Sequence, residues 1–590
     1  MEWYYDEQVQ TGIVIRTHSL LGYEDNTPIY KEYFWTNIPI VLDRGDNKVL
    51  TYDCIIEKFP SISSSLESDS GSGTLVLQNY VTTDVTGAVT GTHLDDLLAS
   101  SIEGRGIKVY LVDITNITLP DFEDATAGIE NQHCIEIYRG IVDSLSGTET
   151  KVNITLKNYV DILNNDLHYK DEDFITPVAD DSPTVPIVVN NSPKPFCYGE
   201  CFNITPRMIN AAFDDGTITG SEYLIDSEQV YNITQVRENG NPLDNSVTST
   251  GDAAYLIITG SGGGNYGEEG VPSIEHSGSI VLVNGDPTSG HGTITCDITG
   301  KQLDKELSIS DHTRPRHPIT ISLDMVKKAF KKNTLTGIED YIDIETFNNT
   351  EILIDSTIST FPSIDFHVGM YITEVTSALT AIQELLASVR CYLYINNRNK
   401  ICVDRFELYD YDNFPDRKPR YVIVQDQVIL GSMNISSIDI PNTRVDLKYK
   451  KNYTIQPPDS LAFVVASQTG EAADKRKEEF ATEHSTVVSE NTYIEKIENT
   501  YPTAIALEVS TLLVRLEGAE VEANARMSVR NRKRKMYSLK VYQLPITMRV
   551  GDWVTIYHFL FSDDSGVING TIISMSMDLL TKITNIEVFV

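Results

Sequence analysis

The chain has 590 residues, 41% of them hydrophobic and 22% charged, so we expect three or four folded domains, each with its own core. Asp and Glu number 84 against 47 Lys and Arg, and the net charge of −37 argues against general binding to nucleic acid or anionic membranes. Residues 1–7 lack the pattern of a signal peptide, no apolar run of about 18 residues occurs, and the seven cysteines form no disulfide framework. We therefore expect a protein that folds in a reducing cytoplasm and has no stable membrane anchor.

The first 175 residues have the alternation of apolar and polar side chains that is typical of β-strands. Strands are predicted at 12–17, 49–58, 73–79 and 104–111. A loop rich in Ser, Asp and Gly is expected at 61–72, and a short helix at 94–99. This part of the chain therefore reads as a β-domain with little helix.

Two stretches far apart in the chain look alike and suggest an internal repeat. Residues 139–144 followed by 151–156 parallel residues 569–574 followed by 582–587. Each pair is a glycine-led strand, a turn and a second alternating strand, and the gap from glycine to lysine differs by one residue. The alternative is that any two hairpins look this similar. If the repeat is real, one chain contains two related β-domains.

Residues 176–201 change character, because prolines recur there among Asp and Asn residues. We expect a linker or extended arm over 176–204, followed by a small inserted β-domain over 205–315. The glycine-rich run at 260–267 lacks the lysine and the Ser or Thr that a phosphate-binding loop requires. We interpret it as a surface loop.

The next part, residues 316–440, is predicted to be an α/β domain. Helices are expected at 319–331 and 377–389, where apolar residues recur at helical spacing. The second helix leads into a strand at 391–395, a turn at 396–399 and a strand at 400–403. A strand at 443–449 opens the last domain.

The last domain, 441–590, is predicted to combine one helix with an all-β unit. The apolar residues between 503 and 518 recur mostly at helical spacing and predict a helix with one buried stripe. Beyond a basic linker, strands are predicted at 537–542, 553–556, 570–577 and 583–590. Turns are expected at 549–552 and 563–566.

The basic linker opposes the acidic character of the chain, and it supplies the candidate interface residues. They are Arg526, Arg530, Arg532, Lys533, Arg534 and Lys535. In one reading they pair with an acidic neighbouring subunit, which would raise the specificity of assembly. In a second reading they face DNA, and in a third they form an exposed, solvated helix end.

Other candidate sites do not lead to catalysis. Cys197 and Cys201 form half of a metal site or a pair of buried structural thiols, and no second close Cys pair supplies the remaining ligands. The acid pairs Asp95-Asp96, Asp180-Asp181 and Asp563-Asp564 lack the ligand spacing of a calcium loop and read as solvated turns. Because no nucleophile or metalloprotease motif is present, we predict no enzymatic activity, no metal and no cofactor.

Several short motifs, in order, resemble the tail hub proteins of long-tailed bacteriophages. The N-terminal matches are the strands and turns at 73–79, 94–98, 103–107 and 138–142. The string "P..yGe.fni.P" at 195–206 is the most specific match, and others lie at 236–243 and 292–300. The C-terminal order of helix, basic connection, strand, "GDwv.i" turn at 551–556 and closing strands matches the family's tube-forming domain.

The resemblance implies a fold that is mainly β with α+β elements. Two related, β-barrel-like tube domains, 1–175 and 441–590, would flank the inserted β-domain and the α/β domain. The implied function is the structural hub of a tail tip: a homotrimer whose six β-domains form a pseudo-sixfold ring. Its implied partners are the distal tail protein, the tail fibre or central spike, and the tape-measure protein, with DNA passing through the channel. The implied location is the virion, after assembly in the bacterial host cytoplasm.

Two other functions remain open on the sequence. The chain is alternatively a receptor-binding or adhesive β-rich tail protein that recognises surface carbohydrate, for which the glycine-rich loop would be the contact. The helical content between 318 and 518 argues against a simple fibre. A hub that carries a cell-wall hydrolase comes third, because it would need a catalytic motif.

Overall fold

The computed structural model of the chain is mainly β, with several sheets and a smaller share of helix. The residues that it describes are 11–24, 27–43, 49–51, 53–65, 73–83, 86–117, 133–169, 174–175, 191–214, 219–227, 230–243, 255–259, 276–283, 292–301, 303, 316–330, 337–338, 340–356, 366–396, 400–542, 544–545, 547–559 and 566–590. Most of the predicted linker, the glycine-rich loop, the turn residues 397–399 and the pairs Asp180-Asp181 and Asp563-Asp564 lie outside them.

The N-terminal sheet has the strand order β5-β2-β1-β11-β12-β13-β8-β6. Its strands are β1 (Thr11–Glu24), β2 (Thr27–Thr36), β5 (Asp53–Cys54), β6 (Ile56–Lys58), β8 (Gly73–Gln78), β11 (Gly106–Asp113), β12 (Cys134–Gly147) and β13 (Lys151–Lys157). Helix α1 (His93–Leu98) begins at a capping box formed by Thr92 and Asp95. The small strands β3 (Val41–Asp43) and β4 (Val49–Thr51) pair with each other, as do β9 (Val81–Thr83) and β10 (Val89–Thr92).

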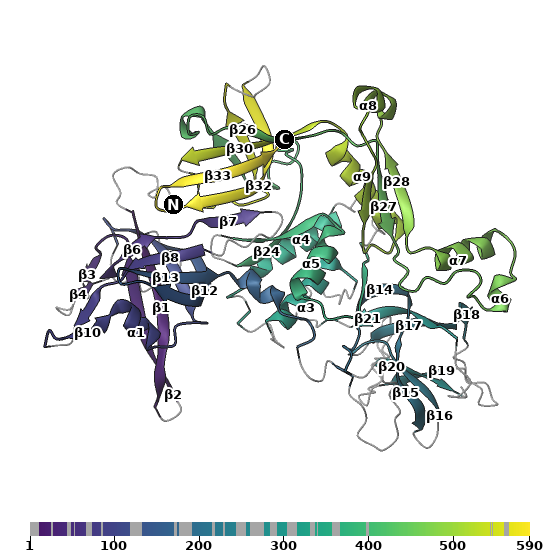
Figure 1. Cartoon of the computed structure of the whole chain (residues 1–590). Coiled ribbons are helices and arrows are strands. Elements are labelled where there is room, and N and C mark those ends of the chain that lie inside the picture. Colours follow the sequence, from purple (N-terminus) through teal and green to yellow (C-terminus); the bar gives the residue numbers. More distant parts are fainter. Residues whose placement is uncertain are drawn as a thin grey trace.

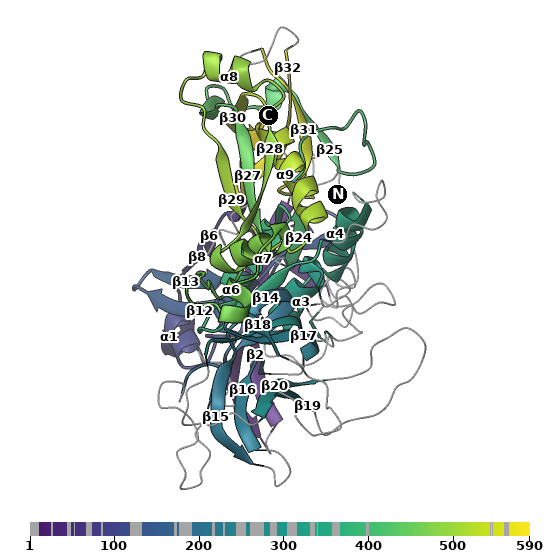
Figure 2. The same ribbon diagram turned by 90° about the vertical axis from the view of Figure 1, so that its right-hand side faces the viewer.

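The inserted sheet lies at the opposite end of the molecule from the C-terminal strands (Figures 1 and 2). Its strands are β14 (Phe196–Ile204), β15 (Arg207–Asp214), β16 (Thr219–Leu224), β17 (Val230–Glu238), β18 (Asn241–Pro242), β19 (Tyr255–Thr259), β20 (His276–Val283), β21 (Ile294–Lys301) and β22 (Gly369–Ile372). Strand β14 lies between β21 and β22, so residues 196–204 are a central strand where the sequence suggested the end of an arm.

A helical layer occupies the centre of Figure 1. It contains α3 (Pro318–Ala329), α4 (Ile344–Ser356), α5 (Ala378–Ala387) and the hairpin of β23 (Cys391–Ile395) and β24 (Ile401–Arg405). Helix α5 begins at Ser377, whose hydroxyl accepts a hydrogen bond from the Thr380 amide. The predicted helices at 319–331 and 377–389 and the hairpin are confirmed, whereas α4 was not predicted.

The C-terminal sheet has the strand order β25-β31-β32-β33-β30-β26. Its strands are β25 (Arg420–Ile423), β26 (Asn434–Asp439), β30 (Arg534–Tyr542), β31 (Trp553–Tyr557), β32 (Val567–Asp578) and β33 (Ile583–Phe589). Beside it, β28 (Ser485–Glu490), β27 (Arg444–Tyr449) and β29 (Leu507–Ser510) form a three-stranded sheet covered by α9 (Leu516–Arg530). The remaining helices there are α6 (Phe463–Ala466), α7 (Glu471–Ala481) and α8 (Ile494–Thr500).

Two predictions in these regions are wrong, and a third is confirmed in part. The helix predicted at 503–518 is strand β29 followed by α9, because Leu507 and Val509 alternate with exposed residues and pair beside β27. The basic linker is therefore the end of α9 and the start of β30. The strand predicted at 49–58 is broken into β4, β5 and β6, and the loop predicted at 61–72 contains β7 (Ile62–Ser65).

The N-terminal and C-terminal sheets both remain open among the described strands. The N-terminal order begins at β5 and ends at β6, and the C-terminal order begins at β25 and ends at β26. The barrel-like closure expected for each unit therefore does not occur among the described strands. Below, the N-terminal unit means the sheet β5-β2-β1-β11-β12-β13-β8-β6 together with α1. The C-terminal unit means the sheet β25-β31-β32-β33-β30-β26.

Candidate assembly interface

The predicted repeat is confirmed for its first strand by backbone hydrogen bonds, whereas its second strand is shifted by one residue from the predicted alignment, because Leu156 corresponds to Val588 and not to Glu587. The Gly104 amide donates to the Val142 carbonyl at 2.8 Å, and the Gly551 amide donates to the Ile572 carbonyl at 2.8 Å. In return, Val142 donates to the carbonyl of Arg105 and Ile572 to that of Asp552. Because both glycines have positive φ, +77° and +90°, each turn enters its strand through the same left-handed conformation.

The following strands keep the same register. Ile107 pairs with Gly140 in the N-terminal unit, and Val554 pairs with Gly570 in the C-terminal unit. In both units the pairing with the next strand has a bulge that begins two residues after this glycine, at 142–144 and at 572–574. A Cβ at Gly570 would lie 2.6 Å from the Phe589 carbonyl oxygen of the next strand. One at Gly140 would lie 2.6 Å from the Tyr138 hydroxyl and 3.0 Å from the Lys157 carbonyl oxygen, so both positions favour glycine.

The equivalence extends to the fourth strand of each unit. Leu156 pairs with both Val142 and Gly73, and its counterpart Val588 pairs with both Ile572 and Tyr537. The strand order β11-β12-β13-β8 therefore matches β31-β32-β33-β30, with the same register except beyond Val109, where β11 and β12 have a bulge that β31 and β32 lack. The outer strands differ, because β1 runs antiparallel to β11 whereas β25 runs parallel to β31.

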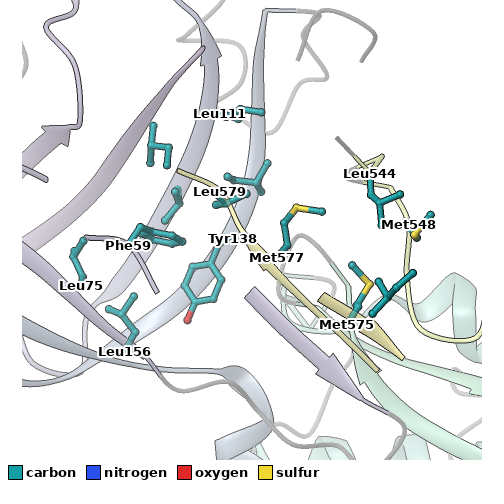
Figure 3. Packing of buried hydrophobic residues seen from close by; sticks show 14 of the residues in the cluster. Phe59, Leu75, Leu111, Tyr138, Leu156, Leu544, Met548, Met575, Met577 and Leu579 are labelled. Atoms are coloured by element: carbon teal, nitrogen blue, oxygen red, sulfur yellow. The ribbon is translucent and has the colours of Figure 1, made fainter. Parts of the chain in front are cut away.

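Strand β7 joins the two units. It leaves the N-terminal unit after β6 and pairs with β32, with Ser65 opposite Ser574 and Ile62 opposite Met577. One hydrophobic cluster continues across this contact, and Figure 3 shows Tyr138 and Phe59 on one side and Met577 on the other. The contact between units is therefore a continuous sheet edge backed by a shared core.

A polar pocket lies where the helical layer meets the C-terminal unit. The cavity has a volume of 450 Å³, and Asp404, Lys418, Arg549 and Asp552 are among its lining residues. Lys418 and Asp404 form an ion pair at 2.5 Å. Asp552 accepts a hydrogen bond from the Arg549 amide, and burial raises the pKa of its carboxyl to about 7.

The six basic candidate residues do not form one patch. Arg526 forms an ion pair with Glu522 at 2.9 Å, and Arg530 forms one with Asp439 at 2.7 Å. Arg534 is buried and donates to the Val529 carbonyl at 2.9 Å, and burial lowers the pKa of its guanidinium to about 10. The three that remain outward are Arg532 and Lys533, both exposed, and Lys535, which is half-buried.

The position of Arg526 is explained by a buried charge cluster that the sequence did not reveal. Glu522 on α9 is completely buried and faces Arg390 at 3.0 Å, Arg405 at 3.5 Å and Arg526 at 2.9 Å. These arginines come from the loop before β23, from β24 and from α9 itself. The cluster therefore ties α9 to the helical layer, and a spacing pattern could not have identified partners so distant in sequence.

The other candidate residues that the structure describes make contacts within the fold. The sulfur atoms of Cys197 and Cys201 lie 3.5 Å apart in a buried position, and burial raises the pKa of the Cys197 thiol. Asp95 caps α1, and Asp96 accepts a hydrogen bond from Lys31. Among the described residues, no group of three His, Cys, Asp or Glu side chains is placed to hold a metal ion. No described helix is long and apolar enough to cross a membrane.

No protein-family model and no curated protein matches the sequence. Solved structures do resemble the chain. The 43 kDa tail protein of prophage MuSo2 from Shewanella oneidensis has 11% identity and a TM-score of 0.34, over 93% of this chain and 98% of its own. The tail protein from Neisseria meningitidis MC58 has 7% identity and a TM-score of 0.33, over 94% and 96%.

A third neighbour is the prophage tail protein gp18 from Listeria monocytogenes EGD-e, with 8% identity and a TM-score of 0.34, over 93% of this chain and 94% of its own. The structural neighbours are thus phage tail proteins, the class that the sequence motifs resemble. Their TM-scores are all below 0.5, so this likeness does not by itself assign a function to the chain.

Proposed function

We propose that the chain is a structural protein of a phage tail, and more specifically the hub of a tail tip. In this proposal three copies form a ring of six β-units, two from each copy. The single observation that carries it is the repeat of four strands with matching register, bulge and turn hydrogen bonds. Two equivalent units in one chain allow a trimer to match a sixfold tube, because closed rings require repeated equivalent interfaces.

The contact between the two units supports the ring geometry. Strand β7 follows β6 of the N-terminal unit in the chain and pairs with β32 of the C-terminal unit. The two units therefore use different surfaces for their contact. Such a heterologous contact generates a ring when its rotation closes. The open edges of both described sheets leave strands available for contacts outside the chain.

The proposed mechanism is mechanical. Packing between units keeps the ring closed until the tail engages its receptor, and the ring then opens a passage for DNA without reading its sequence. The tube units would be residues 1–175 and, from β25 onward, residues 420–590, with the inserted β-domain starting at β14 (Phe196–Ile204) and the α/β domain between that domain and β25. The distal tail protein would bind one face of the ring, and the fibre, spike or tape-measure end the other.

The six basic residues receive different roles in this proposal. Arg526, Arg530 and Arg534 stabilise the fold of their own copy through the contacts described above. Arg532 and Lys533 are exposed on a protein of net charge −37, so they suit a contact with an acidic surface of a neighbouring copy. No catalytic residue, metal or cofactor is part of the proposed function.

The mass of the purified protein in solution tests the proposal. Light scattering should give three times the chain mass of 65.9 kDa, and averaged particle images should show a ring with a near-sixfold outline. An elongated trimer without a channel would instead support the adhesive tail protein. A species that stays monomeric, alone and with its tail partners, would refute the hub.

A further inference from the structure

One strand edge in the N-terminal unit lacks the neighbour that its repeat counterpart has. Residues 144–147 of β12 pair with β13 on one side, and no described strand pairs with their other side. The equivalent residues of β32, 574–577, pair with β33 on one side and with β7 on the other. The two edges match in register, yet only one of them is covered by a described strand.

The exposure of the two edges agrees with this difference. Ser144, Ser146 and Gly147 are exposed, whereas their counterparts Ser574 and Ser576 are half-buried and Met577 is 5% exposed. The β12 edge also carries no proline and no charged residue at 144–147, the devices that usually protect a free edge from pairing. Its bulge does not prevent pairing either, because β7 pairs with β32 just beyond the equivalent bulge.

The repeat also identifies a strand that is placed to cover this edge. Ile56 pairs with Leu77 on β8, and Val428 pairs with Val541 at the equivalent position of β30. Strand β7 begins six residues after Ile56, and β26 begins six residues after Val428, as the numbering of Ile62 and Asn434 shows. Strand β26 ends its sheet, so no described strand covers its outer edge.

We infer that β26 of a second copy of this chain pairs with residues 144–147 of β12, as β7 pairs with β32 within one chain. This inference rests on the proposed function, because it supplies the contact between copies that a ring needs. Applying the β7 register to the repeat places Ser437 opposite Ser144 and Asn434 opposite Gly147, in an antiparallel pair. Main-chain hydrogen bonds would provide the attraction, as in other strand-addition contacts.

Cysteine cross-linking tests the register directly. Directly opposed residues of antiparallel strands have Cβ atoms about 4.5–5.5 Å apart, close to disulfide geometry. Under mild oxidation the double variant Ser144→Cys, Ser437→Cys should yield covalent dimers and trimers on a non-reducing gel. The matched control is Ser144→Cys with Asn434→Cys, whose second cysteine would lie opposite Gly147, three residues along the strand from Ser144, and it should give at least about tenfold less product.

Hydrogen exchange in the unmodified protein provides a second measurement that needs no variant. Those amides of residues 144–147 that do not donate to β13 should exchange about tenfold or more slowly in the assembled ring than in the monomer, while the amides of 574–577 are protected in both. A trimer without cross-linking and without protection at 144–147 would overturn this inference and leave the hub intact. A protein that never assembles would overturn both.

Discussion

The Asp552 carboxylate accepts a hydrogen bond from the Arg549 amide at 2.9 Å while only 2% of the Asp552 residue is exposed. Both residues belong to the turn that begins the repeated strands of the C-terminal unit. Burial raises the pKa of Asp552 to about 7, well above its ordinary value of 3.8. The turn therefore has a titratable group whose charge differs between the folded and unfolded chain near neutral pH.

We predict that Asp552 makes stability fall as pH rises from about 4 to about 7. Over this range the unfolded chain has lost the proton and the folded chain keeps it, so stability falls by at most about 1.4 kcal/mol per pH unit. Above the folded pKa both states are ionised and the contribution stays constant.

The variant Asp552→Asn mimics the protonated side chain and should remove this slope. Denaturant midpoints at several pH values between 4 and 8 measure it, as the difference between variant and parent. The variant Asp426→Asn, at an exposed position, should follow the parent at every pH. An Asp552→Asn curve parallel to that of the parent would show that the carboxylate does not titrate in this range.

A second prediction concerns the buried cluster around Glu522. Replacing Glu522 with Gln leaves the guanidinium groups of Arg390, Arg405 and Arg526 without their counter-charge, and should cost about 3–5 kcal/mol of unfolding free energy. The matched control is Glu520→Gln, an exposed position on the same helix, with a change within about 0.5 kcal/mol. Equal denaturation midpoints for the two variants would argue that the cluster contributes little.

The alternation of apolar and polar residues made most strands of the N-terminal and C-terminal units predictable from the sequence. Leu539 and Val541 on β30 are buried, as are their counterparts Leu75 and Leu77 on β8, so period two was visible in both units. The region 503–518 misled because its apolar residues fit both periods, and the β-branched Val509 pairs beside β27. Strand β7 has no apolar alternation, since three of its four residues are serines, and its partner strand β32 lies 509 to 515 residues further along the chain, from Ser65–Ser574 to Ile62–Met577.

The candidate interface was only partly predictable, for a similar reason. The resemblance between 139–144 and 569–574 indicated the repeat, but its register and bulge depend on pairings that no sequence pattern shows. The density of positive charge at 526–535 indicated a cluster. Arg526 contacts Ala387 and Glu522, and Arg530 contacts Asp439. The sequence does not show these contacts, so it could not distinguish the two paired arginines from the exposed Arg532.

A third prediction tests the core that the two units share. Leu579 is 4% exposed and lies beside the N-terminal residues of the cluster in Figure 3, whereas its neighbour Leu580 is 38% exposed. We expect Leu579→Ala to cost about 2–5 kcal/mol because it leaves a cavity, and Leu580→Ala about 0.5 kcal/mol. Chemical denaturation measures both. If the two variants lose the same unfolding free energy, the Leu579 side chain does not hold the two units together.

The last prediction separates a role in assembly from a role in folding for the basic residues. The double variant Arg532→Glu, Lys533→Glu reverses two exposed charges, so the monomer should keep its denaturation midpoint within about 0.5 kcal/mol. If these residues meet an acidic surface of a neighbouring copy, the dissociation constant of the trimer should rise about tenfold at low salt. The rise should be smaller at high salt.

Sedimentation of parent and variant over a range of salt concentrations measures the change. The variant Lys496→Glu, at an exposed position on α8, alters charge in the same direction away from this segment and should leave assembly unchanged. If both variants weaken the trimer equally, the effect comes from overall charge. If neither weakens it, Arg532 and Lys533 are solvated ends of α9 and β30, and the contact between copies depends on strand pairing.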